Sequence, residues 1–79
     1  MTLKNLDTVV LERDLPEHGL RKGDLGAVVH MHGESRLEVE FVRASGQTQA
    51  VVQLDAADVR PVRDEDLLAV RSVSATGAV

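Results

Sequence analysis

The sequence predicts an all-β fold, a small five-stranded SH3-like barrel with one short helical turn before its last strand and a C-terminal extension. Three observations support this prediction. Residues 36–42 alternate between apolar and polar side chains, the period-2 pattern of a strand with one buried face. The other apolar runs are too closely spaced to hold the crossover helices of a parallel sheet. Asp55 to Asp58 is a short stretch with a capping aspartate, which fits one helical or 3₁₀ turn before the last run.

Short turns and one long excursion separate the expected strands. The excursion from Arg13 to Asp24 contains Pro16 and Gly19, which exclude a helix interior and a central strand. Leu15 and Leu20 stand among polar neighbours, so we expect both side chains to fold back over one end of the core. We expect strands at residues 5–12, 25–32, 36–42, 48–54 and 59–62.

Glycines mark the turns around the second strand. Gly26 is also a candidate β-bulge residue. The pattern alone therefore does not decide whether Val28 or Val29 faces the core. Because glycine tolerates positive φ values, we assign the following glycines to structural turns: Gly19, Gly23, Gly26 and Gly33.

Alternation along the strands also predicts the core. Val10, Val42 and Val51 are apolar residues that fall on the nominally outer faces. The predicted core residues are Val9, Leu11, Val28, Leu37, Val39, Phe41, Ala50, Val52, Leu54 and Val59.

With 79 residues, the chain has room for one domain. We place the barrel in residues 1–63 and a C-terminal extension in residues 64–79. Asp64 to Asp66 fit the start of a helix, because acids favour its N-terminal end, whereas Leu67 to Val73 fit a strand equally well. Both alternatives stay open, and we expect Ser74 to Val79 to be frayed.

Composition excludes several classes of function. The chain has 13 acidic and 9 basic residues, a net charge of −4, whereas nucleic-acid surfaces are usually basic. Phe41 is its only aromatic residue, so a stacking platform for bases or a groove for polyproline peptides lacks its usual basis. The absence of cysteine removes disulfides and thiol chemistry. With no apolar run near the ~20 residues of a membrane span, we expect a cytoplasmic protein without membrane contact.

Several segments carry a resemblance to a known family. They are Asp7-Thr-Val-Val-Leu, Asp14-Leu-Pro-Glu, Gly19-Leu-Arg-Lys-Gly-Asp-Leu-Gly-Ala-Val-Val, Leu37-Glu-Val-Glu-Phe-Val and Asp58-Val-Arg-Pro-Val. Over residues 3–73 the chain resembles short uncharacterised bacterial proteins that share a domain of unknown function. Its Gly23-x-x-Gly26-x-Val28 motif is also similar to the KOW modules of ribosomal and transcription proteins. The resemblance implies a fold and no established activity.

Two histidines raise the question of a metal site. His30 and His32 are two residues apart on an expected strand, so they leave the same face and approach Glu34, Glu38 or Glu40. A zinc site needs three or four converging ligands. Alternating polar residues are ordinarily the solvated face of a strand, so we expect no metal and no cofactor.

The sequence also predicts that the protein is not an enzyme. Asp14, Glu17 and His18 are chemically suited to acid–base catalysis, but nothing in the pattern brings them together. No serine stands in a nucleophile-elbow motif, and Gly23-x-x-Gly26 lacks the lysine of a phosphate loop.

Protein recognition is the remaining class. We therefore expect a non-enzymatic interaction module that binds another protein or itself, as a homo-oligomer. Its acidic character suits a basic partner such as a nuclease, in the manner of an antitoxin or immunity factor. The candidate interaction residues are Val10, Val51, Leu67, Leu68 and Val70.

Two alternatives accompany this expectation. In the first, the C-terminal residues fold down over the outer valines and complete the core, which leaves nothing exposed. In the second, the protein is a KOW-like nucleic-acid module whose loop from Leu20 to Asp24, with Arg21 and Lys22, meets backbone phosphates.

Overall fold

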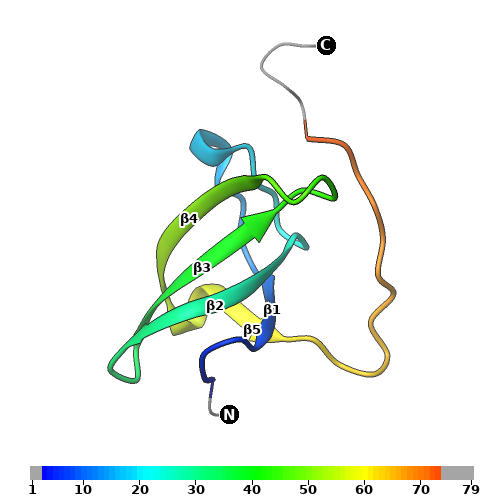
Figure 1. Cartoon of the computed structure of the whole chain (residues 1–79). Coiled ribbons are helices and arrows are strands. Elements are labelled where there is room, and N and C mark those ends of the chain that lie inside the picture. The colour runs from blue at the N-terminus through cyan, green and yellow to red at the C-terminus, as the bar shows by residue number, and fades with distance from the viewer. Residues whose placement is uncertain (1–2, 74–79) are drawn as a thin grey trace.

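The computed structural model describes residues 3–73 as one antiparallel sheet of five strands (Figure 1). The strands follow the order β4-β3-β2-β1-β5, so β4 and β5 lie at the edges. The predicted all-β fold class, with one 3₁₀ turn before the last strand, is confirmed. The elements are β1 (Thr8–Leu11), η1 (Pro16–His18), β2 (Leu25–His32), β3 (Arg36–Val42), β4 (Thr48–Asp55), η2 (Ala56–Asp58) and β5 (Val59–Pro61).

The central strand β3 has the alternation predicted from its sequence. It pairs with β2 on one side and with β4 on the other. Leu37 and Val39 are fully buried, and Phe41 is 2% exposed. The polar residues between them, Glu38 and Glu40, occupy the opposite face, as the pleat of a strand requires.

A bulge in β2 resolves which of its two valines is buried. Val28 pairs with Val39, but the next pair is His30 with Glu38, so Val29 is the extra residue. Val28 is fully buried, whereas Val29 is 37% exposed. The inserted residue shifts the inward positions from even to odd numbers, because successive side chains in a strand point to opposite faces.

The predicted core is confirmed with one partial exception. Ala50 is half-buried and packs against the core rather than lying within it. As expected, Leu15 and Leu20 are buried in the core, at 2% and 3% exposure. A β-bridge within the excursion also pairs the two residues. The other predicted core residues are all buried: Val9, Leu11, Val28, Leu37, Val39, Phe41, Val52, Leu54 and Val59.

The first strand corrects two predictions. It begins at Thr8 rather than Asn5, because residues 4–7 form a turn in which Asp7 N donates to Lys4 O and Leu6 has a φ of 74°. Val10 was expected to be exposed, but it is only 7% exposed. It lies between Leu25 and Arg60, its register partners on the flanking strands, and their side chains share its face and cover it.

The turn between β4 and β5 agrees with its predicted position, within one residue at each strand. β4 extends to Asp55, and β5 ends at Pro61 rather than Val62. The Asp58 carboxylate accepts a hydrogen bond from the Asp55 N–H (3.1 Å) and another from Arg13 Nε (3.0 Å). These bonds tie η2 to the excursion after β1.

Three of the four glycines assigned to turns have the expected positive φ. These are Gly19 (70°), Gly23 (99°) and Gly33 (76°). The assignment of Gly26 to a turn or a bulge is wrong, because Gly26 is a buried residue inside β2 that pairs with Val9. A Cβ there would lie 2.5 Å from Val39 Cγ1, so glycine is needed for close packing.

The C-terminal segment, residues 62–73, corrects a further prediction. It is neither a helix nor a strand: one turn at residues 64–65 is followed by extended, irregular chain. It leaves β5 and arcs along one side of the sheet toward the loop between β3 and β4 (Figure 1). The expected fraying of residues 74–79 lies outside the described residues. No helix in the described part of the chain is long and apolar enough to cross a membrane.

Candidate interaction groove

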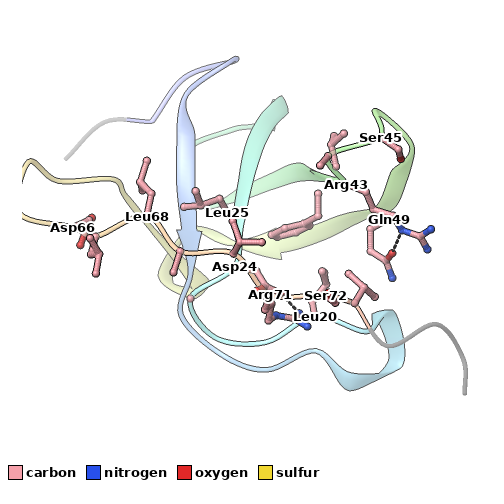
Figure 2. Close-up of a pocket in the computed structure, with 18 of the residues that line it drawn as sticks. Leu20, Asp24, Leu25, Arg43, Ser45, Gln49, Asp66, Leu68, Arg71 and Ser72 are labelled. Carbon is pink, nitrogen blue, oxygen red and sulfur yellow. Dashed lines mark hydrogen bonds and ion pairs between the residues drawn. The ribbon is translucent and has the colours of Figure 1, made fainter. Parts of the chain in front are cut away.

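A groove of about 760 Å³ separates the C-terminal segment from the sheet (Figure 2). Its apolar lining comes from strand and loop residues on one side and from the segment on the other. The strands supply Leu25, Phe41 and Val42. The segment supplies Leu67, Leu68, Val70 and Val73. The apolar lining of the groove suits contact with an apolar surface.

An arginine–carboxylate pair fixes the start of the segment. Arg60 on β5 donates two parallel hydrogen bonds to Asp66, from Nη1 to Oδ2 (2.8 Å) and from Nη2 to Oδ1 (2.9 Å). The Arg63 N–H also donates to Asp66 Oδ2 (2.7 Å). The hydrogen bonds from Arg60, followed by the bond from Arg63, lower the pKa of Asp66 from 3.8 to about 2.

A second arginine–carboxylate pair fixes the end of the segment. Arg71 Nε donates to Asp24 Oδ1 (2.8 Å), Nη2 donates to Asp24 Oδ2, and Nη2 also donates to the Gly19 carbonyl (3.1 Å). Partial burial raises the pKa of Asp24, but hydrogen bonds from Arg71 and from the Arg21 N–H together lower it below its ordinary value. The same pair raises the pKa of Arg71.

Between these two ion pairs, the apolar side chains of the segment are exposed. Leu67 is 91% exposed, Leu68 is 64% exposed and Val70 is 99% exposed. Within residues 3–73, the last backbone hydrogen bond along the chain runs from Asp66 N to Arg63 O. The alternative in which these residues fold down to complete the core is therefore wrong, although the segment is anchored.

The two predicted interaction residues outside the segment, Val10 and Val51, do not line the groove. Val51 is 53% exposed on the edge strand β4, as expected, whereas the outer valine Val42, 50% exposed, does line the groove. Val10 is covered by its neighbours, as described above. Leu25, at 38% exposure, is an apolar groove residue that the sequence did not single out.

The two histidines lie together, as their spacing predicted. The ring centroids of His30 and His32 are 4.4 Å apart, and His32 Nε2 is hydrogen-bonded to Glu38 Oε2 at 3.0 Å. Glu40 instead accepts a hydrogen bond from the Thr48 hydroxyl (2.5 Å). Among the described residues, no group of three or more His, Cys, Asp or Glu side chains is placed to hold a metal ion.

Two of the three residues considered for acid–base catalysis, Asp14 and His18, make hydrogen bonds that stabilise the excursion between β1 and β2. Asp14 Oδ1 accepts a hydrogen bond from the Lys22 N–H (2.8 Å). The His18 carbonyl accepts one from Gln49 Nε2 (3.0 Å), which joins η1 to the start of β4. These bonds have a clear structural role in holding the excursion against the sheet.

Comparison with known protein families gives a match for the chain. Residues 5–61 match a family described as a domain of unknown function (DUF4926), which is more than half of the 79 residues. The chain belongs to this family. The DUF4926 match includes every strand and ends at Pro61, so the C-terminal segment lies beyond it. No curated protein and no solved structure matches the chain.

Proposed function

We propose that the protein is a non-enzymatic interaction module that serves as the small acidic partner of another protein and also associates with itself. The observation that carries this proposal is the groove with its apolar neighbour, the C-terminal segment. The groove lining includes large apolar side chains that are at least 38% exposed, and two of them, Leu67 and Val70, are almost fully exposed. The others are Leu25, Val42 and Leu68. Contiguous exposed apolar side chains of this kind mark protein-interaction sites.

The fold supports an SH3-like module in this proposal. Five short antiparallel strands run in the order β4-β3-β2-β1-β5, and a single 3₁₀ turn joins β4 to β5. Within the long excursion between β1 and β2, Leu15 pairs with Leu20, and burial of both side chains in the core holds the excursion on the sheet. Such a scaffold presents its loops and its edge strands to a partner.

Surface charge supports a basic partner. Within residues 3–73, six carboxylates lie outside ion pairs, against four lysine and arginine side chains. The excess favours association with a cationic protein through electrostatic steering. An antitoxin or immunity factor for a basic toxin has this character. The unpaired carboxylates are Asp14, Glu17, Glu34, Glu40, Asp64 and Glu65.

A second candidate is a KOW-like nucleic-acid module. Arg21 and Lys22 are exposed at the turn before β2 and form no ion pair with another residue in the range 3–73, which favours this candidate. The Asp14 carboxylate, which is in no ion pair within residues 3–73, accepts a hydrogen bond from the Lys22 N–H, so an unpaired negative charge lies at the same turn. The acidic balance of the chain makes protein recognition the better supported function.

Retention of partners on the immobilised full-length chain tests the proposal. We expect an extract of the native host, treated with nuclease, to supply a basic protein whose retention falls as salt is added. The matched measurement applies purified RNA and DNA at the same salt concentrations. Retention of nucleic acid with a steep salt dependence, and of no protein, would reject the proposal in favour of the KOW-like module.

A further inference from the structure

One face of the molecule carries a protrusion and a hollow of the same chemistry, side by side. The protrusion consists of Leu67 and Val70, which belong to the segment's wall of the groove but are 91% and 99% exposed, so they are free to contact a second molecule. The hollow is the groove of about 760 Å³, whose apolar lining also includes Leu25 and Val42 from the sheet and Leu68 from the segment. We infer that two copies of the chain pair through this face about a two-fold axis, with Leu67 and Val70 of each copy seated in the groove of the other. The inference deepens the self-association in the proposed function by naming the face.

The symmetry of a two-fold dimer selects a face of this kind. In such a dimer both subunits use the same patch, so the patch must contain both halves of each complementary contact. A face that carried only a groove could not pair with a copy of itself, because the copy would have nothing to fill that groove. A face that carried only an apolar protrusion would likewise find no groove on the copy. Here the C-terminal segment supplies the protrusion and also forms one wall of the groove.

The charges at this face permit two acidic copies to approach. The chain carries a net charge of −4, which by itself disfavours self-association. The two acids lining the groove, Asp24 and Asp66, are already neutralised by Arg71 and Arg60 of the same chain. Arg43 also lines the groove, and the only hydrogen bond that its side chain makes among the described residues goes to the neutral side chain of Gln49.

The segment is also ordered before it meets a second copy. Ion pairs hold it on both sides of Leu67 to Val70, at Asp66 and at Arg71. Binding energy is lost when flexible groups must be ordered on association, so a segment tied at both ends retains more of it. Arg60 and Arg71 therefore act as positioning residues for the protrusion.

Sedimentation equilibrium of the full-length chain tests the inference. We expect a monomer–dimer equilibrium for the parent, and at least a tenfold weaker association for Leu67→Asp and for Val70→Asp. Both side chains are almost fully exposed, so neither change should unfold the chain, which circular dichroism will check. Val51→Asp is the matched control, because Val51 is also exposed (53%) but lies on β4 outside the groove. It should associate like the parent.

Three results would overturn the inference. The first is a parent chain that stays monomeric at millimolar concentration. The second is a dimer that survives both Leu67→Asp and Val70→Asp, and the third is a dimer that only Val51→Asp disrupts, which would place the interface on the edge strand β4. A monomeric chain that still retains a host protein would leave the proposed partner function standing and reject only the pairing of two copies.

Discussion

Gly26 shows at the scale of a single residue how tightly this small core is packed. It faces Val39 and Phe41 from inside β2, and a Cβ at this position would lie 2.5 Å from Val39 Cγ1 and 2.9 Å from Phe41 Cε2. Neither neighbour can yield easily, because both are almost completely buried. The sole aromatic side chain of the protein therefore depends on the absence of a side chain opposite it.

Gly26→Ala should destabilise the fold by about 1–3 kcal/mol, because it overfills a close-packed core. Val39→Ala removes the nearest methyl group, so the double mutant should lose less free energy of unfolding than the sum of the two single mutants. Gly23→Ala is the control: its φ of 99° makes alanine strained, but nothing lies within 4 Å. It should show no coupling to Val39→Ala. Urea unfolding measures all of these free energies, and strictly additive losses at Gly26 and Val39 would contradict the argument.

Local residue patterns predicted which side chains of the strands are buried, but they did not predict the role of Gly26 or the burial of Val10. Leu37, Val39 and Phe41 alternate without interruption, so a period of two was enough to place them. The role of Gly26 depends on side chains from β3, thirteen or more residues away, and no local pattern shows that distance. Val10 is covered because its register partners are Leu25 and Arg60, and register between strands is likewise not a local property.

At the scale of elements, the course of the C-terminal segment likewise depends on contacts between residues far apart in the chain. Its sequence fitted a helix or a strand, and in the structure the segment forms neither. Two arginine–aspartate pairs determine its course instead, and one of them joins residues 47 positions apart. The sequence did not identify Arg71 as the partner of Asp24, because charges that far apart in the chain have no spacing rule.

The ion pair between Asp66 and Arg60 should persist to low pH. The pKa of Asp66 is lowered from 3.8 in the unfolded chain to about 2, so its stabilising effect is complete above about pH 4 and is lost as the pH falls toward 2. Carboxyl chemical shifts followed by NMR should therefore show Asp66 titrating with a midpoint near 2. Arg60→Gln should move the midpoint toward 3.8, because the hydrogen bonds from Arg60 are the main cause of the shift. A midpoint unchanged by Arg60→Gln would contradict this assignment.

At the scale of the whole molecule, the fold and the candidate interaction face belong to different parts of the chain. The buried core runs from Val9 to Val59, and the family match ends at Pro61. The C-terminal segment adds two ion pairs and one wall of the groove, but none of its side chains belongs to the core. Folding therefore depends on residues before the segment, and the proposed self-association depends on the segment itself.

Ending the chain after Arg63 should separate these two properties. The shortened protein should still unfold cooperatively in urea, since it keeps every core residue. The shortened chain loses two ion pairs, that of Arg60 with Asp66 and that of Arg71 with Asp24. Loss of the partly exposed pair between Arg71 and Asp24 should by itself cost on the order of 1 kcal/mol. Light scattering should show a monomer where the full chain is larger, because both Leu67 and Val70 are gone. A shortened chain that fails to fold would make the segment an integral part of the domain, and one that associates like the parent would remove any role of the segment in assembly.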